Sequence, residues 1–365
     1  MKKLLLVILI ATVTNTLLAQ DGYYFVKGKV MDESTGQSLQ AASVFTQNTT
    51  FGTATDAEGN FALRLPNGGY DLVVTYTGYE TESKRITTAD GDNKNIVIVM
   101  KQKDKALETV AIKSSNEVKN GWEVYGDFFI DNFLGKTANS KQCVIKNKED
   151  IKFYFSKKKN RLKVMSEAPI EIVNNALGYT IKYSLDSFTH EYNTQISVNS
   201  GFPLFEAHTT ADINQLTIWN ENRKKAYNGS ILHFMRSVYQ RTMKENGFEI
   251  QFVVKNNEIE NTITLKDFYK ALNYSKDDST QSVDIYPNQE SVAVIYKKEM
   301  PEELFLANQE MEDSSFQLSI VNFLPNQPIT IEQNGYYFDQ NEITLTGYWN
   351  WEKVGDMLPY DYIPN

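Results

Sequence analysis

Residues with nucleophilic or metal-binding side chains are scarce in this chain. Its 365 residues include one cysteine, Cys143, and three histidines, His190, His208 and His233. A single cysteine excludes an internal disulfide, and no two histidines have the HExxH spacing of a zinc site. Cys143 lies in an apolar, strand-like segment, which favours a buried, inert thiol over a nucleophile activated by a nearby base. The sequence therefore predicts neither a metal nor a cofactor.

Clustered positive charge is also missing. The formal net charge is −9, from 46 acidic and 37 basic residues. This acidic balance argues against a nucleic-acid partner, because phosphates attract clustered lysine and arginine. The single basic run, residues 157–161, lies between two strand-like segments. We interpret it as a solvated hairpin tip, with an anion or membrane contact as the alternative.

Long apolar runs are absent beyond the N-terminus. Lys2 and Lys3 precede an apolar stretch over residues 4–11, and the small residue Ala19 ends a second short apolar run. This layout is typical of a secretory signal peptide, whereas the alternative, a membrane anchor, needs about 20 apolar residues. We therefore expect residues 1–19 to be cleaved on secretion across the inner membrane, which removes two lysines and moves the formal charge to −11. The mature chain is predicted to have no transmembrane segment and to lie in the periplasm or at the outer membrane.

Short strand-like segments separated by turn residues begin near residue 24. Candidate strands cover residues 25–31, 42–46, 51–55, 61–65, 70–76 and 96–100. No helical pattern interrupts them, and strands of this length and spacing predict an all-β sandwich or barrel. We interpret residues 56–60 as a hairpin turn rather than a calcium site at Asp56 and Glu58, because an EF-hand loop is longer and ends in a ligating glutamate.

Six short motifs occur in order along this segment. They are Gly28-Lys29-Val30, Ser34-Thr35-Gly36-Gln37, Ala42-Ser43-Val44, Gly52-Thr53-Ala54-Thr55-Asp56, Glu58-Gly59-Asn60-Phe61 and Tyr76-Thr77-Gly78-Tyr79. The series resembles the carboxypeptidase-like regulatory domain, a transthyretin-like or Ig-like β-sandwich common in envelope proteins of Bacteroidota, and the resemblance covers residues 24–112. Domains of that family are non-catalytic and occur fused to peptidases or ahead of TonB-dependent outer-membrane barrels. The resemblance therefore implies a binding or assembly module without catalytic residues.

A polar, charged linker separates this segment from a second region, residues 121–365. At its start, five aromatic residues fall on one side of a predicted helix that Gly135 ends. They are Trp122, Tyr125, Phe128, Phe129 and Phe133. We interpret this face as packing on the following sheet, with an exposed aromatic platform for a glycan as the alternative.

The rest of the second region combines strands with one helical hairpin. Strand patterns cover residues 143–146, 151–155, 162–165, 178–192, 196–207, 248–254, 292–296, 316–321 and 329–332. Pro203 predicts a sheet edge or a bulge. The period becomes helical over residues 212–227 and 230–245, with Ser230 as an N-cap and Gly247 as the C-terminal stop. The fold class expected is therefore mainly β, with the sandwich followed by a larger β-rich α+β domain.

The helical hairpin carries the densest group of polar and aromatic side chains. The candidate binding residues there are Arg223, Tyr227, Ser230, His233 and Arg236. Ser230 and His233 lie one helical turn apart and could pair as nucleophile and base, but the Gly-x-Ser-x-Gly elbow is absent, which favours capping. Arg223 and Arg236 could bind an anion, although an ion pair with Glu or Asp is the favoured interpretation.

Aromatic residues also gather near the C-terminus. Trp349 and Trp351, with Tyr360 and Tyr362 nearby, could bind sugar rings and complete the candidate binding residues, but a packed closure of the fold is the favoured interpretation. Together with the helical hairpin, this C-terminal segment resembles an uncharacterised envelope family whose members carry the same N-terminal sandwich. The motifs of that second resemblance are Phe133-Leu134-Gly135, Asn174, Leu177-Gly178-Tyr179 and Gly347-Tyr348-Trp349. It implies no activity.

These patterns favour a non-enzymatic, exported binding or assembly protein of the bacterial cell envelope. Its partner would be an outer-membrane or envelope protein, or a glycan. The alternatives are a hydrolase, either peptidase or glycosidase, with its site in the second region, and a glycan-binding protein. Carboxylates are too numerous for the sequence to select a catalytic pair, whose separation in space would decide the matter.

Overall fold

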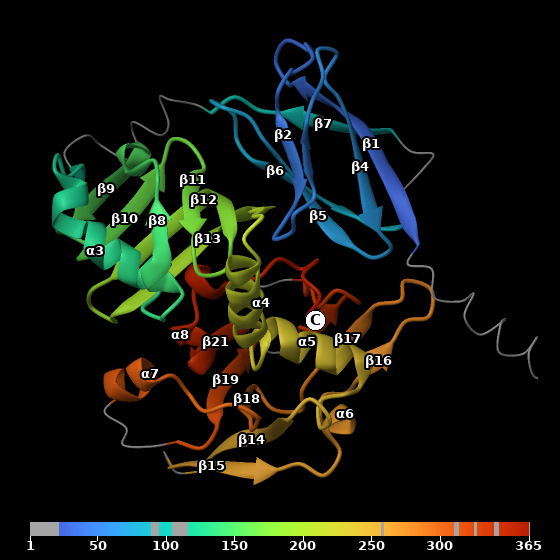
Figure 1. Cartoon of the computed structure of the whole chain (residues 1–365), viewed down its shortest axis with the longest axis vertical. Coiled ribbons are helices and arrows are strands. Elements are labelled where there is room, and N and C mark those ends of the chain that lie inside the picture. Colours follow the sequence, from blue (N-terminus) through green and yellow to red (C-terminus); the bar gives the residue numbers. More distant parts are fainter. Residues whose placement is uncertain are drawn as a thin grey trace, which may run out of the picture.

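The fold combines three β-rich parts, which Figure 1 shows around the C-terminus of the chain. The computed structural model describes residues 22–88, 95–103, 116–256, 259–309, 314–324, 327–338 and 343–364. The chain is mainly β, with 42% strand and 20% helix, so the predicted fold class is confirmed. The predicted signal peptide and most of the predicted linker lie outside the described residues. None of the helices in the described ranges is long and apolar enough to cross a membrane.

The N-terminal part is a sandwich of two sheets, with strand orders β4-β1-β7 and β3-β2-β5-β6. Its strands are β1 (Tyr23–Asp32), β2 (Ser43–Thr46), β3 (Gly52–Ala54), β4 (Asn60–Pro66), β5 (Tyr70–Thr75), β6 (Glu82–Ile86) and β7 (Asn95–Met100). Along β4, buried Phe61, Leu63 and Leu65 alternate with exposed residues, because only one face of the sheet meets the core. The sequence pattern missed β6, an edge strand whose residues are polar apart from Ile86.

The middle part is a six-stranded sheet with one helix against it. Its elements are α3 (Gly121–Phe133), β8 (Cys143–Ile145), β9 (Ile151–Ser156), β10 (Arg161–Ser166), β11 (Ile170–Asn174), β12 (Tyr179–Glu191) and β13 (Ile196–Ala207). Long β12 pairs with β13 along one edge and with β11 and then β10 along the other. Phe129 and Phe133 of α3 are buried against this sheet, as the aromatic pattern predicts. The basic run forms the exposed turn between β9 and β10.

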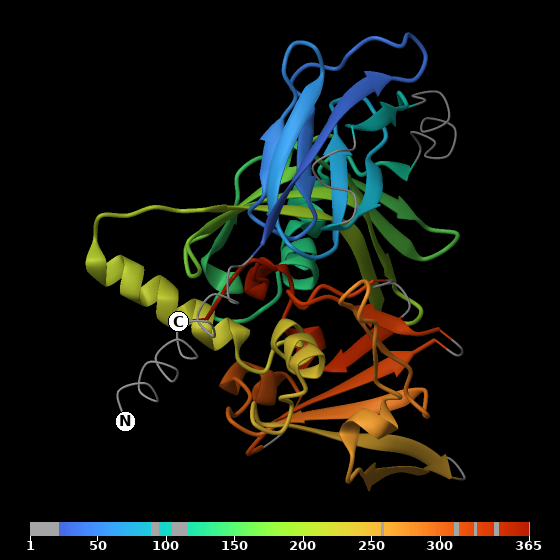
Figure 2. The same cartoon turned by 90° about the vertical axis from the view of Figure 1, so that its right-hand side faces the viewer.

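The C-terminal part consists of a five-stranded sheet, a three-stranded sheet and the helical hairpin. The strand orders are β15-β14-β18-β19-β21 and β16-β17-β20. The elements are α4 (Ile213–Tyr227), α5 (Ile231–Gln240), β14 (Phe248–Asn256), β15 (Ile259–Thr264), α6 (Phe268–Ala271), β16 (Ser275–Lys276), β17 (Val283–Ile285), β18 (Ser291–Tyr296), α7 (Glu303–Asn308), β19 (Gln317–Phe323), β20 (Ile329–Ile331), β21 (Ile343–Gly347) and α8 (Tyr348–Trp351). The first half of α4 projects away from the rest of the molecule (Figure 2).

Helix α5 ends earlier than the sequence pattern indicates. Its last residue is Gln240, and Arg241 turns the chain with a left-handed φ of 58°. The N–H group of Thr242 then donates to the carbonyl oxygen of Ser237 and closes the helix end. The predicted stop at Gly247 is therefore wrong. Gly247 has a φ of 91° and instead forms the turn that enters β14.

The sandwich is docked on the middle part through main-chain hydrogen bonds. The turn after β2 lies along the open edge of β13, where the N–H group of Asn48 donates to the carbonyl oxygen of Pro203 at 2.7 Å. In the same turn, the carbonyl oxygen of Thr49 accepts from the N–H group of Phe205 at 2.9 Å. Pro203 therefore lies on an edge strand, as predicted, and the sandwich satisfies part of that edge. Tyr360, near the C-terminus, donates from its N–H group to the carbonyl oxygen of Asn48.

Candidate functional site

The two arginines of the helical hairpin hold backbone loops in place. Arg223 Nε lies 2.6 Å from the carbonyl oxygen of Leu177. Arg236 Nε and Nη2 lie 2.9 and 3.0 Å from the carbonyl oxygens of Asn334 and Tyr360. The expected ion pairs with Glu or Asp are therefore wrong for both arginines. Each guanidinium instead satisfies carbonyl groups that would otherwise lack partners away from water.

Ser230 and His233 do not form a nucleophile and base pair. Ser230 caps α5, as predicted: its Oγ accepts from the backbone N–H of His233 at 3.2 Å and donates to the carbonyl oxygen of Tyr227 at 2.7 Å. The His233 ring lies instead between aromatic rings, and its Nδ1 accepts from the N–H group of Gly229. The candidate binding residues of the hairpin therefore lie close together, but their side chains are engaged in contacts that stabilise the fold.

The buried position of His233 predicts a pH dependence of stability. Burial, followed by the positive charges of Lys298 and Arg236, lowers its pKa from 6.5 to about 4. The unfolded chain therefore binds more protons between these two values, and stability falls as the pH falls through them. Between pH 7 and pH 5 we expect the unchanged protein to lose about 2 kcal/mol more unfolding free energy than the His233→Phe variant, in urea titrations at both pH values. Equal losses would contradict a neutral buried imidazole.

Trp349 and Trp351 are both buried, with 6% and 9% of their surface exposed. Trp349 Nε1 donates to the carbonyl oxygen of Gly229 at 2.7 Å, and its ring packs on Phe234. Trp351 packs on Phe305. Both rings are packed against other aromatic rings and largely buried, so the structure does not favour sugar binding through these two residues. Their packing agrees with the favoured interpretation, closure of the fold.

Metal and thiol chemistry also find no site in the described ranges. No group of three or more His, Cys, Asp or Glu side chains there could hold a metal ion. Burial raises the pKa of Cys143 to about 12, so its thiol is protonated at neutral pH and is a poor nucleophile. Asp56 accepts from the backbone N–H groups of Glu58 and Asn60, which is the hairpin-turn geometry that the sequence predicts.

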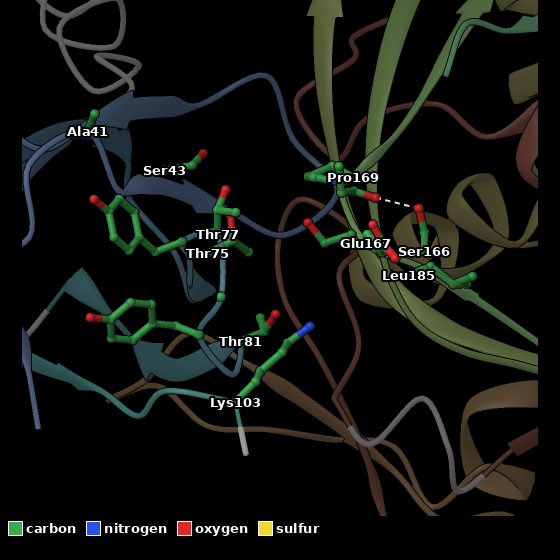
Figure 3. A pocket seen from close by; sticks show the side chains of 15 residues that line it. Ala41, Ser43, Thr75, Thr77, Thr81, Lys103, Ser166, Glu167, Pro169 and Leu185 are labelled. Carbon is green, nitrogen blue, oxygen red and sulfur yellow. Dashed lines mark hydrogen bonds between the residues drawn. The ribbon is translucent and has the colours of Figure 1, made fainter. Parts of the chain in front are cut away.

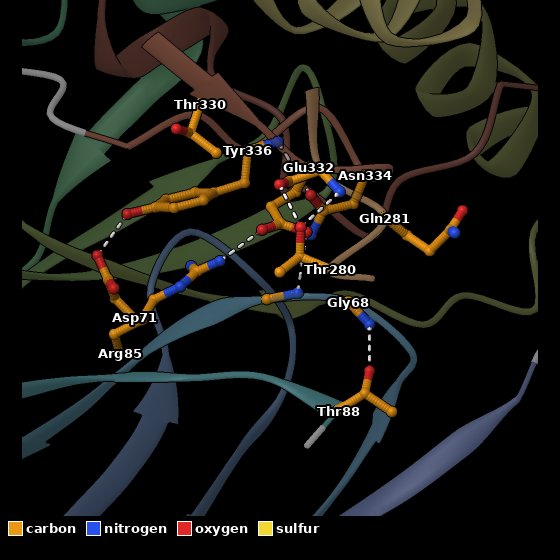
Figure 4. Close-up of polar contacts among 12 residues, drawn as sticks. Gly68, Asp71, Arg85, Thr88, Thr280, Gln281, Thr330, Glu332, Asn334 and Tyr336 are labelled. Atoms are coloured by element: carbon orange, nitrogen blue, oxygen red, sulfur yellow. Dashed lines mark hydrogen bonds and ion pairs between the residues drawn. The ribbon is translucent and has the colours of Figure 1, made fainter. Parts of the chain in front are cut away.

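A polar cluster fixes the sandwich to the C-terminal part (Figure 4). The carboxylate of Glu332 accepts from Arg85 Nη2 at 2.6 Å and from the N–H group of Gly69 at 3.3 Å. Beside it, the hydroxyl of Tyr336 donates to the carboxylate of Asp71. Glu332 and Tyr336 follow strand β20, whereas the other three residues belong to the sandwich. Burial raises the pKa of Glu332, while the charge of Arg85 opposes this rise.

On another side of the junction, an open cleft of about 250 Å³ lies between the sandwich and the middle sheet. We call it the junction cleft. From the sandwich it is lined by Ala41, Ser43, Thr75, Tyr76, Thr77, Gly78, Tyr79, Thr81 and Lys103, and from the middle part by Ser166, Glu167, Ala168, Pro169, Ser184 and Leu185. Figure 3 shows Lys103 and Glu167 on its opposite walls. The cleft exists only because the two parts are docked.

Many hydroxyl groups of the junction cleft have no hydrogen-bond partner among the described residues. Six of them make no hydrogen bond with the described part of the chain: those of Ser43, Thr75, Tyr76, Thr77, Thr81 and Ser184. Two buried hydroxyls of the sandwich, by contrast, are engaged: Thr49 Oγ1 donates to the carbonyl oxygen of Thr46, and Thr55 Oγ1 to that of Leu39. The unpartnered hydroxyls are therefore available to water or to a ligand.

The sequence did not single out the junction cleft. Residues 76–79 carry one of the motifs of the regulatory-domain resemblance, but nothing in the sequence connects them with the turn at residues 166–169. That turn joins β10 to β11 and faces the sandwich only after docking. Long-range proximity of this kind leaves no periodic signal in a single sequence.

These features define a class of protein: an N-terminal β-sandwich docked on a β-rich region that contains a helical hairpin. Residues 26–112 match the family model of the CarboxypepD_reg-like domain. The chain therefore carries a CarboxypepD_reg-like domain, and the predicted resemblance is confirmed over these residues. A search of curated proteins found no match.

Several solved structures are similar to this chain. A DUF3823 family protein from Bacteroides ovatus has 12% identity and a TM-score of 0.17, with 53% of this chain and 85% of that chain covered. A DUF3823 family protein from Parabacteroides merdae has 9% identity and a TM-score of 0.18, with coverage of 50% and 82%. The 3-chlorocatechol 1,2-dioxygenase from Rhodococcus opacus has 12% identity and a TM-score of 0.19 over 23% of this chain, which spans only 61% of that structure. Scores this low carry no argument about function.

Proposed function

We propose that this protein is a non-enzymatic, exported binding protein of the bacterial cell envelope, and that its ligand occupies the junction cleft. The observation that carries the proposal is that residues from two docked parts line this cleft with hydroxyls that make no hydrogen bond to the described residues. The residues that could have supported hydrolysis are engaged otherwise, since Ser230 caps a helix and His233 is packed among aromatic rings. Export is inferred from the signal-peptide pattern of residues 1–19.

The CarboxypepD_reg-like domain supports a role in binding rather than in catalysis. In this chain the domain supplies one whole wall of the junction cleft, and the turn at residues 166–169 supplies part of the other. A ligand held between the two walls would contact both parts at once. Binding of the ligand would therefore stabilise the docking of the two parts. An envelope partner bound near the cleft would then contact two parts held in a fixed arrangement.

Filling the junction cleft should abolish ligand binding. We expect at least one compound class in a panel of peptides, glycans and small metabolites to raise the melting temperature of the mature protein. The Thr77→Trp variant should lose this shift, because residue 77 is exposed and lines the cleft, and its hydroxyl makes no hydrogen bond to the described residues. Its own melting temperature should stay within about 2 °C of the original value, since surface substitutions seldom change stability much.

The matched control is Thr346→Val on β21, an exposed residue outside the cleft. This variant should keep the full ligand-induced shift. Turnover of any peptide or glycan of the panel by the purified protein would contradict the non-enzymatic role. A shift that survives in Thr77→Trp would place the ligand elsewhere and contradict the cleft.

A further inference from the structure

We infer that the ligand of the junction cleft is a neutral saccharide. This inference rests on the proposed function and adds the chemical class of the ligand. It follows from four properties of the lining: its hydroxyl groups, its charge balance, the pairing of its strands and the fixed position of a tyrosine ring.

The hydroxyl groups match a ligand that is itself rich in hydroxyls. Each serine, threonine or tyrosine hydroxyl can donate one hydrogen bond and accept others, so it can meet either end of a sugar O–H group. The unpartnered hydroxyls come from both walls, with Ser43 and Thr75 on the sandwich and Ser184 on the middle sheet. A ligand that bonds to all three must present polar groups on opposite sides, as a sugar ring does.

The charge balance of the lining favours a neutral ligand. Among the described residues that line the cleft, Lys103 carries the only positive charge and Glu167 the only negative one. They lie on opposite walls (Figure 3). An anionic ligand such as a uronate or a phosphate would call for several cationic donors, for which arginine is the usual residue. A cationic ligand would call for several carboxylates. The described lining has an excess of neither positive nor negative charge.

The pairing of the sandwich strands disfavours an extended peptide. A peptide that adds to a sheet needs a free strand edge for its main-chain hydrogen bonds. On the sandwich wall, Ser43 belongs to β2 and Thr75 to β5. Strand β2 pairs with β3 and β5, and β5 pairs with β2 and β6, although the pairing with β6 ends at Val74. The edge strands of this sheet, β3 and β6, contribute no residue to the described lining, so this wall offers a ligand mainly side chains.

A tyrosine ring in the lining is held in place before any ligand binds. The hydroxyl of Tyr79 donates to Asp32 at 2.5 Å and accepts from Gln102 Nε2 at 3.1 Å. Tyr76 packs against it, with ring centroids 5.3 Å apart. Half-buried aromatic rings offer apolar faces to the C–H groups of a sugar. Because Asp32 already orders Tyr79, saccharide binding would cost little side-chain entropy there.

Calorimetric titration of the mature protein, residues 20–365, tests this inference. The probes are neutral hexasaccharides of glucose, mannose, xylose and N-acetylglucosamine, matched acidic oligosaccharides of galacturonate, and the peptide panel. We expect at least one neutral oligosaccharide to bind. The Thr75→Val variant, which removes one hydroxyl and keeps the β-branched shape, should weaken that binding about three- to tenfold. The control Thr346→Val should leave the affinity unchanged.

The outcomes separate this inference from the proposed function. If only acidic oligosaccharides or peptides bind, and Thr77→Trp abolishes that binding, the saccharide inference is wrong and the binding function stands. If a neutral oligosaccharide binds equally well to the unchanged protein and to both Thr75→Val and Thr77→Trp, it binds elsewhere and the inference is wrong. If no probe of any class binds, both the inference and the proposed function fail.

Discussion

The Glu332→Ala variant should lose about 3 kcal/mol of unfolding free energy, because it leaves the guanidinium of Arg85 without its charge partner at a buried junction. The Glu332 side chain is 7% exposed and that of Arg85 30% exposed. The substitution also removes the acceptor for the N–H group of Gly69. Urea unfolding of the mature protein at neutral pH, followed by tryptophan fluorescence, measures the loss.

An exposed ion pair provides the matched control. Lys182 and Glu206 lie 2.6 Å apart, with their side chains 46% and 50% exposed. Because water screens such a pair, Glu206→Ala should cost less than about 1 kcal/mol. The double variant Arg85→Leu with Glu332→Leu should recover much of the loss of Glu332→Ala, since it removes both charges together. If Glu332→Ala and Glu206→Ala cost the same, the buried ion pair does not stabilise the docking.

The Trp349→Ala variant should lose about 4 kcal/mol of unfolding free energy, the cost of removing a large buried aromatic side chain. The indole fills part of the C-terminal core beside Phe234, and its N–H group donates to Gly229 in the turn between the two helices of the hairpin. The same urea titration measures this loss. Trp349→Phe, which keeps most of the packing and loses only the hydrogen bond and some volume, should cost about half as much.

The same pair of variants decides between two roles of Trp349. At a temperature where Trp349→Phe remains folded, its affinity for an oligosaccharide that binds the unchanged protein should not change, because the indole does not face the junction cleft. A Trp349→Phe variant of full stability that has lost oligosaccharide binding would show instead that this tryptophan contacts the sugar.

Local sequence patterns predicted most of the elements near the junction. Alternating residues predicted β1 and β12, a turn predicted the start of β4, and residues 196–207 were expected to return against β12. The position of Pro203 predicted an edge or a bulge, and β13 is the edge that the sandwich covers. The patterns failed for β6, whose residues are polar apart from Ile86 and so do not alternate. They also failed at the end of α5, where Arg241 adopts a left-handed conformation and ends the helix early. For Arg223 and Arg236 the predicted partners were wrong, because both guanidinium groups donate to carbonyl oxygens of residues distant in the sequence.

Local patterns were sufficient to predict a mainly β chain with an N-terminal sandwich, because turn residues and apolar alternation act over a few neighbouring positions. Short motifs in a fixed order also indicated the family of that sandwich. The location of a candidate ligand site became visible only once the parts were docked. The junction cleft depends on hydroxyls from residues more than a hundred positions apart, such as Thr75 and Ser184, and these face one cavity only after the sandwich docks on β13.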